Sequence, residues 1–522
     1  MICEKEDSQL DSGIGSDMFE IKHSEEMGRY LVASRNIDER ALIICEKPIV
    51  CGPGDDDRNI DVGEIPMCLG CFTRMTSNPW MRCSKCGWPV CSAECEIADH
   101  HVENECQVFI SNSVAYPCRH TWPIVNKSIL VLRTLLLKSK FPAVWQEVIL
   151  KLEHHTKIRQ TKPYCVKGDE MLLDNISDFL NDCGYELEQE IIQISGVINV
   201  NAFSTAKSEF QGRDCVRIIQ CIYTWASLLS HSCVPNACWS IDNTKELKIS
   251  IRATTSIKKG DVINIAYNLP ETMSGTLHRI ISTEDVAHFL CRCKRCSDKT
   301  ELGTFTSAIK CFDCENGYLL PEKPTIADSE WECCGCDSVQ AVPKIVLFLN
   351  NIEETYENIR RRQYSRDIEV KKLELLLRQT GDLLHENHYI LQEFRMRIIN
   401  LQVHSLDNVN EMDLERFINH CKFMLKIADV LMPGFSKTRA LLQFFLSQGL
   451  LRKASTKTQD PEEEEESEKE IADLYKEIHY LQTRALLYFN NQHSYNLRSE
   501  TESNQFAVCI KRQLKNLESY IN

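Results

Sequence analysis

The stretch from Cys68 to Cys106 reads CLGCFTRMTSNPWMRCSKCGWPVCSAECEIADHHVENEC. It is dense in cysteine, poor in aliphatic residues and too short to bury a hydrophobic core of its own. Its cysteines fall in closely spaced pairs, and this spacing lets both thiolates of a pair reach one metal ion. The stretch offers eight ligands, enough for two tetrahedral zinc sites: Cys68, Cys71, Cys83, Cys86, Cys91, Cys95, His101 and Cys106. We therefore predict that metal ions hold this segment together.

Two further cysteine clusters lie toward the middle of the chain. One cluster supplies only three ligands, whereas a closed structural zinc site needs four, so its fourth ligand must come from elsewhere. The other forms the two knuckles of a ribbon-like site, in which Cys334 rivals Cys333. The two sets are Cys291, Cys293 and Cys296, and Cys311, Cys314, Cys333 and Cys336.

The composition limits the kinds of partner that the protein has. With 27 cysteines and an acidic N-terminus that resembles neither a signal nor a transit peptide, we expect a reducing compartment, the cytoplasm or the nucleus. The formal net charge of -15 argues against a surface that seeks nucleic acid or anionic lipid. The Cys68–Cys106 stretch itself holds three basic residues against five acidic ones, so nucleic-acid binding there is not expected. No apolar run is long enough to predict a membrane span, and we expect a monomer.

The pattern along the 522 residues predicts an α+β chain with several structural units. Short strand-like segments flank the first cysteine region and return later, and Tyr30–Ser34 with Ala41–Val50 suggests a β-hairpin. Long amphipathic helices fill the C-terminal third. The predicted units are a mobile tail (1–26), two β-rich segments (27–66 and 201–270), three metal-held segments (67–106, 271–300 and 301–340), a helical insertion (107–200) and an all-helical C-terminal domain (341–522) with an acidic loop near 460–470.

Several motifs resemble those of SET domains. The segment SLLSHSCVPN, residues 227–236, resembles the motif Asn-His-Ser-Cys-x-Pro-Asn, and KKGDVINIAY, ending at Tyr267, resembles the strand that delivers the catalytic tyrosine. Gly28-Arg29-Tyr30-Leu31 resembles the opening strand, and Asn201-Ala-Phe203 resembles an element that contacts the cofactor. FLCRCKRCSDKTELGT, from Phe289 onward, resembles the post-SET region.

The Cys68–Cys106 stretch resembles a MYND zinc finger, through CSAEC and HHVENEC. Its cross-braced topology implies one zinc on Cys68, Cys71, Cys91 and Cys95, and a second on Cys83, Cys86, His101 and Cys106. The family usually has three residues between the histidine and the last cysteine; His101 leaves four and His100 leaves five, so His101 is favoured. A SET domain split by a MYND finger is the order of the SMYD proteins, and the extra cysteine ribbon suggests the arthropod SMYD-A branch. The resemblance covers residues 28 to 340 and extends more weakly into the helices.

The resemblance implies a protein-lysine N-methyltransferase that uses S-adenosylmethionine, with a protein substrate. It makes Tyr267 the catalytic residue and Phe289 a wall of the lysine channel. It assigns cofactor binding to Gly28, Arg29, Tyr30, Asn201, Ser230, His231, Tyr267 and Phe289. It also supplies the missing ligand, because Cys233 would join Cys291, Cys293 and Cys296 on one zinc ion. Four zinc ions per chain are therefore expected.

Three positions depart from the family pattern. Tyr30 stands where a second glycine is usual, Ser230 replaces an asparagine, and Ala287 occupies a position that often holds an active-site tyrosine. A side chain at residue 30 would limit close approach of a ligand to the backbone, and a serine offers a shorter hydroxyl in place of an amide. The alternative hypothesis is a catalytically impaired, zinc-stabilised scaffold that binds proline-rich peptides through the MYND finger.

Overall fold

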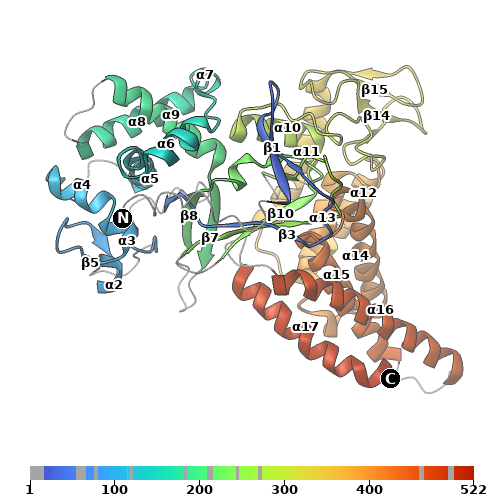
Figure 1. Ribbon diagram of the computed structural model, residues 1–522. Coiled ribbons are helices and arrows are strands. Elements are labelled where there is room, and N and C mark those ends of the chain that lie inside the picture. Colours follow the sequence, from blue (N-terminus) through green and yellow to red (C-terminus); the bar gives the residue numbers. More distant parts are fainter. Residues whose placement is uncertain are drawn as a thin grey trace.

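A computed structural model describes most of the chain: residues 17–54, 66–73, 75, 80–114, 116, 122–180, 185–208, 216–242, 246–267, 273–457, 464–491 and 499–521. Short strands form its centre, with helices on both sides (Figure 1). The strands up to residue 267 are β1 (Phe19–Ser24), β2 (Gly28–Ala33), β3 (Leu42–Glu46), β4 (Val50–Pro53), β5 (Met81–Arg82), β6 (Pro89–Val90), β7 (Phe203–Ser208), β8 (Val216–Ile222), β9 (Ser230–His231), β10 (Ala237–Ile241), β11 (Ile249–Ala253) and β12 (Asn264–Ile265). The α+β class is confirmed.

Strand β1 corrects two predictions about the N-terminus. It pairs with β2 along its full length, from Phe19 opposite Ala33 to Ser24 opposite Gly28. Residues 19–24 are therefore not part of a mobile tail, because Phe19 is buried and its ring lies 5.7 Å from that of Trp225. The hairpin predicted between residues 30–34 and 41–50 is also wrong, since β2 pairs with β1 and β3 pairs with β11. Residues 1–16 lie outside the described part of the chain.

The sheets join the two β-rich segments, which are far apart in sequence. One antiparallel sheet has the order β10-β11-β3 and another has the order β4-β8-β7. In β11 the buried residues Ile249, Ile251 and Ala253 alternate with half-exposed ones, the period expected of a strand with one face on the core. The SET-type unit is thus assembled from both sides of the insertion.

The inserted finger and helices share one hydrophobic core with these strands. Trp88 of the finger stacks on Phe109 at 4.3 Å between ring centroids and meets Phe179 edge-on at 5.7 Å. The helices of this region are α2 (Ala93–Glu96), α3 (Asp99–Val102), α4 (Glu105–Ser111), α5 (Trp122–Lys140), α6 (Pro142–Glu147), η2 (Ile149–Lys151), α7 (Thr156–Arg159), α8 (Pro163–Leu180) and α9 (Tyr185–Asn201), with η3 (Ala226–Leu228) in the later SET segment. Because the core is continuous, the finger is fixed to the SET unit rather than tethered to it.

The C-terminal part contains two further cores. Helix α10 (Thr276–Ala287) leads into a four-stranded ribbon with the order β13-β14-β15-β16, which packs against helices α11 to α13. Helices α14 to α17 form the second core. The elements are β13 (Ile309–Lys310), β14 (Tyr318–Pro321), β15 (Trp331–Cys333), β16 (Val339–Gln340), α11 (Val342–Arg361), α12 (Arg366–Gly381), α13 (Tyr389–Gln402), η5 (Leu406–Asn408), α14 (Glu411–Leu431), α15 (Lys437–Lys457), α16 (Glu464–Asn491) and α17 (Ser499–Ile521).

The predicted acidic loop is shorter than expected. Residues 464–470 are the first turns of α16, so the prediction is wrong for them, while residues 460–463 lie outside the described part. Glutamate is a good helix former, and this preference outweighs the repulsion between neighbouring acidic residues. Among the described residues, no helix combines the length and the apolar character that crossing a bilayer would require.

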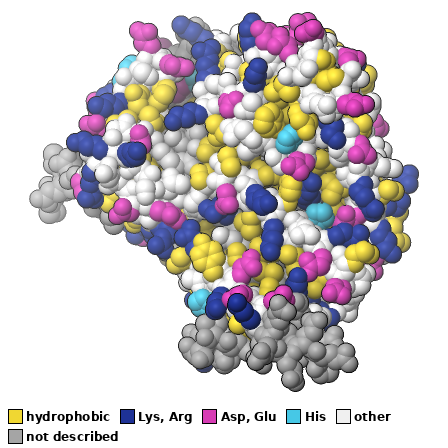
Figure 2. Space-filling view, turned by 90° about the vertical axis from the view of Figure 1, so that its right-hand side faces the viewer, with side chains coloured by type: hydrophobic (Ala, Val, Ile, Leu, Met, Phe, Trp, Pro, Cys, Tyr) yellow, Lys and Arg dark blue, Asp and Glu magenta, His cyan; other side chains and the backbone are white. Residues whose placement is uncertain are grey.

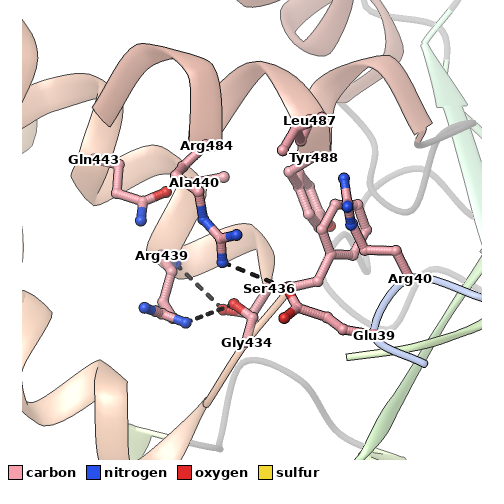
Figure 3. A pocket seen from close by; sticks show the side chains of 11 residues that line it. Glu39, Arg40, Gly434, Ser436, Arg439, Ala440, Gln443, Arg484, Leu487 and Tyr488 are labelled. Carbon is pink, nitrogen blue, oxygen red and sulfur yellow. Dashed lines mark hydrogen bonds and ion pairs between the residues drawn. The ribbon is translucent and has the colours of Figure 1, made fainter. Parts of the chain in front are cut away.

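A close backbone contact joins the SET unit to the C-terminal helices beside a small pocket (Figure 3). Phe435 donates its amide to the Thr254 carbonyl at 2.8 Å, and Arg484 forms an ion pair with Glu39 at 3.4 Å. Gly434 has φ of +73°, and a Cβ atom built there would lie 1.8 Å from the Thr254 oxygen. Only glycine permits this approach.

Gly434→Ala should therefore weaken the junction. The clash and the left-handed backbone together should lower the free energy of unfolding by about 3 kcal/mol. Gly381→Ala is the matched control, because nothing lies within 4 Å of its Cβ position at the end of α12. Scanning calorimetry should show a lower unfolding midpoint for Gly434→Ala alone, and equal midpoints in the two variants would contradict this account of the junction.

Candidate functional site

The centre of the site is a parallel pairing of two short strands. Ser230 of β9 lies opposite Asn264 of β12, and His231 lies opposite Ile265. Beyond the strands, the Ser232 amide donates to the Ile265 carbonyl at 2.9 Å. This pairing brings the motif at residues 230–236 beside the segment that leads to Tyr267.

Two asparagines hold this pairing in register. The backbone amide of Asn264 donates to Asn236 Oδ1 at 2.9 Å, and the backbone amide of Asn236 donates to Asn264 Oδ1 at 3.1 Å. Asn236 Nδ2 also donates to the Val262 carbonyl at 2.8 Å. Asn264 was not singled out from the sequence, although it lies within the quoted stretch KKGDVINIAY.

Three aromatic rings from separate segments meet next to the paired strands. The ring centroid of His231 lies 5.2 Å from that of Tyr267 and 6.0 Å from that of Phe289, and the last two are 6.2 Å apart. Because the Tyr267 amide donates to His231 Nδ1 at 3.1 Å, a neutral His231 carries its proton on Nε2, which lies 3.4 Å from Cys233 Sγ. Burial lowers the pKa of His231 to about 4, which favours this neutral form.

Tyr267 has an exposed side and a buried hydroxyl. The residue is 38% exposed, yet its hydroxyl donates to the Leu229 carbonyl at 2.6 Å. Burial of the phenol raises the pKa of Tyr267 above its usual value. The hydroxyl is therefore protonated at neutral pH, and its oxygen can still accept a hydrogen bond.

Cys233 belongs to both the motif and a metal-ligand set. Its sulfur lies 3.9 Å from that of Cys291 and 3.5 Å from that of Cys296, and Cys293 completes the group. A tetrahedral zinc ion with Zn–S bonds near 2.3 Å separates its sulfurs by about 3.8 Å, whereas a disulfide needs about 2.05 Å. The set therefore fits a metal ion, and it contains the fourth ligand that the resemblance supplied.

A buried charge network supports this set. Arg279 donates from Nη2 to Cys296 Sγ at 3.5 Å and from Nη1 to Glu301 at 2.9 Å, and Arg295 pairs with the same carboxylate at 2.8 Å. Although burial raises the pKa of Glu301, the two arginines outweigh it and lower that pKa to about 2. The network brings net positive charge to a site whose four thiolates around Zn²⁺ would carry two negative charges.

The two finger sets are also assembled as predicted. Cys68, Cys71, Cys91 and Cys95 form one group, and Cys83, Cys86, His101 and Cys106 form the other. His101 Nε2 lies 3.7 Å from Cys86 Sγ, and its Nδ1 donates to Glu105 at 2.7 Å. Such a carboxylate partner orients a metal-binding imidazole. The geometry therefore favours His101 over His100 as the ligand.

Arg133 extends this contact into the SET insertion. It donates to both oxygens of Glu105, at 2.6 and 2.7 Å, and to the carbonyls of Cys51 and Leu69 at 3.0 and 3.1 Å. Both side chains are buried. Neither residue was singled out from the sequence, although a carboxylate four residues after His101 is a signal that could have found Glu105.

The ribbon set consists of Cys311, Cys314, Cys333 and Cys336. The sulfurs of Cys311 and Cys336 are 3.7 Å apart, and so are those of Cys314 and Cys333. Cys334 is exposed, and its sulfur accepts a hydrogen bond from the Tyr318 amide instead. The geometry thus favours Cys333 over its rival.

Two of the remaining predicted cofactor residues bind backbone carbonyls of the insertion. Arg29 donates to the Lys151 carbonyl at 2.7 Å, and Asn201 Nδ2 donates to the Glu153 and Val197 carbonyls at 2.7 and 2.8 Å. Gly28 has φ of +62° with no atom within 4 Å of its Cβ position. Because both Nδ2 hydrogens of Asn201 are used within the protein, its contact to a ligand would go through Oδ1 or the backbone.

The three unusual positions differ in their surroundings. Ser230 and Tyr30 are half-buried, and Tyr30 lies on β2 opposite Lys22 of β1. Ala287 ends α10 and is 4% exposed, so neighbouring atoms fill the space around it. The absence of a tyrosine there does not leave an open gap.

Comparisons with known proteins agree with this geometry. Residues 28–268 match the SET domain family. The chain is 25% identical over 334 residues to the SET domain-containing protein SmydA-8, isoform B, of Drosophila melanogaster, covering 63% of this chain and 69% of that protein. It is 22% identical to the histone-lysine N-methyltransferase ASHR1 of Arabidopsis thaliana, with 79% and 83% covered. It is also 22% identical to the N-lysine methyltransferase SMYD2-B of Danio rerio, with 46% and 53% covered.

The paired strands, the tyrosine beside them and the cysteine set behind them define a SET-domain protein. With a finger inserted between its two β-rich segments, the chain is a SET-domain protein of the SMYD family, similar to proteins that include lysine N-methyltransferases. The predicted family is confirmed.

Metal analysis of the purified chain should give four zinc ions, one for each ligand set. His101→Ala should lose one ion and destabilise the finger, because three ligands do not close a structural site. His100→Ala is the matched control and should keep all four. Two ions or fewer in the unaltered chain, or a loss in the His100 variant alone, would contradict these ligand sets.

Proposed function

We propose that the protein transfers a methyl group from S-adenosylmethionine to the ε-amine of lysine side chains in other proteins. The observation that carries the proposal is the meeting of His231, Tyr267 and Phe289 beside the metal set that contains Cys233. Three segments distant in sequence supply these rings. A tyrosine hydroxyl and a buried imidazole held side by side in this way form a candidate reaction centre.

Lysine methylation requires a neutral amine in line with the methyl group, inside a channel that excludes water. Bound S-adenosylmethionine would supply the sulfonium methyl. Tyr267 gives its own hydrogen to Leu229, so its oxygen is oriented to accept a hydrogen bond from the amine. Because its raised pKa keeps the phenol neutral, we assign Tyr267 to orientation of the amine and not to proton abstraction.

The cofactor wall would be formed by residues 28–30, Asn201, Ser230 and His231. The glycine conformation at Gly28 leaves the backbone open on one side, which suits close approach of a ligand. Arg29 and Asn201 both bind backbone carbonyls of residues 151–153, so the opening strand and the end of α9 share one support. Phe289 would wall the lysine channel.

The alternative scaffold function has one observation in its favour. Trp80 of the finger meets Tyr116 of the insertion edge-on at 5.5 Å, and the Arg82 guanidinium lies over both rings at 5.4 and 4.8 Å. Aromatic surfaces of this kind suit proline-rich peptides. This binding is compatible with methyl transfer, but it would not depend on Tyr267.

Tyr267→Phe should reduce methyl transfer at least about a hundredfold, because it removes the oxygen that orients the amine. The measurement is transfer of labelled methyl from S-adenosylmethionine to an array of lysine-bearing peptides. Tyr223→Phe is the matched control, since Tyr223 also donates its hydroxyl to a backbone carbonyl, that of Leu247, at 2.6 Å. Equal activity of the two variants would remove Tyr267 from the reaction.

A further inference from the structure

The ribbon exposes apolar side chains next to its metal set. Phe312, between ligands Cys311 and Cys314, is 39% exposed, whereas Phe72 of the finger is buried. The Phe312 ring meets Phe348 of α11 edge-on at 5.3 Å, and the Lys344 ammonium lies 4.9 Å from its centre. The zinc site alone would not require an exposed ring there, since apolar area left in water gains no burial energy.

Strand β16 lies against the same knuckle. Ser338 Oγ donates to Asp313 Oδ2 at 2.5 Å, and Gln340 Nε2 lies within 3.3 Å of the same oxygen. Lys344 donates to Gln340 Oε1 at 2.6 Å, which connects β16 to α11. Leu347 of α11 is 64% exposed. We call Phe312, Lys344, Leu347 and Phe348 the knuckle surface.

The ribbon that carries Phe312 is strongly acidic. Residues 310–340 contain seven acidic and two basic side chains, and four thiolates around Zn²⁺ would add two negative charges. Figure 2 views the molecule from the side of the ribbon, and its upper part shows hydrophobic side chains among acidic and basic ones. The exposed acidic residues of the ribbon include Asp313, Glu315, Glu322, Asp328, Glu330, Glu332 and Asp337.

We propose that the knuckle surface binds a lysine- or arginine-rich segment of the protein substrate that carries an apolar side chain. The identity of the occupant as substrate rests on the proposed function. Exposed apolar side chains on an acidic ribbon fit such a segment, whose cations meet the carboxylates. The negative charge of the ribbon disfavours binding of nucleic acid. A second copy of this chain would place two negatively charged ribbons against each other.

The ribbon is joined firmly to the proposed reaction centre. Ser307, just before β13, donates to Glu301 of the buried network and accepts from the Thr276 amide at 3.0 Å. A substrate held at the knuckle surface would therefore be kept at a fixed position relative to the lysine channel. Such tethering raises the effective concentration of the target lysine and should lower KM more than it changes kcat.

The test uses the full chain, without S-adenosylmethionine, and fluorescence anisotropy of a synthetic peptide in which lysine alternates with alanine around one leucine. Two matched peptides carry serine in place of the leucine, or glutamate in place of every lysine. We compare Leu347→Ser and the double variant Glu315→Lys/Asp337→Lys with a charge-matched control in α16, Glu470→Lys/Asp473→Lys. Zinc content is measured in each variant to confirm that the ribbon is intact.

The unaltered chain and the α16 control should bind the lysine-leucine peptide, and each ribbon variant should weaken it about tenfold or more. The serine peptide should bind more weakly, and the glutamate peptide should not bind. Absence of binding, or equal affinity in ribbon and control variants, would overturn the proposal. So would concentration-dependent dimers that Leu347→Ser abolishes. Because no methyl transfer is measured, these outcomes are independent of the test at Tyr267.

Discussion

The Cys233 thiolate is the constraint on which the rest of the site depends. It lies within the motif that pairs with β12, and its sulfur is also grouped with three cysteines from beyond α10. A metal ion at this set would fix the post-SET segment against the motif, and with it Phe289 against His231 and Tyr267. The aromatic centre therefore depends on a metal-ligand set that lies outside it.

Buried arginine and glutamate side chains support two of the four metal sets in a similar way. At the post-SET set, Arg279 reaches a ligand sulfur directly and shares Glu301 with Arg295. At the finger, Glu105 orients His101 and is itself held by Arg133. Removing one partner would leave a buried charge uncompensated, which is strongly destabilising. These contacts explain why the finger, the insertion and the SET strands fold around one core.

The metal sets could be predicted from sequence because each ligand pair is local and its spacing reflects a short turn around an ion. The place of Tyr267 beside His231 came from the order of the SET motifs. The partners of β2 and β3 could not be predicted, since strand pairing is set by long-range packing such as that of Phe19 on Trp225. The Arg133–Glu105 contact, 28 residues apart, and the Gly434 contact with Thr254 were missed for the same reason.

The most direct test of the link between the Cys233 set and the reaction centre is calorimetric titration with S-adenosylmethionine. It would compare the unaltered chain, Cys233→Ser and Cys311→Ser, with zinc content measured alongside. A serine oxygen is a harder ligand than a thiolate, so each variant should lose the ion of its own set. The account predicts that the unaltered chain binds, that Cys233→Ser loses most of its affinity and that Cys311→Ser keeps it. Absence of binding to the unaltered chain, or equal losses in the two variants, would contradict it.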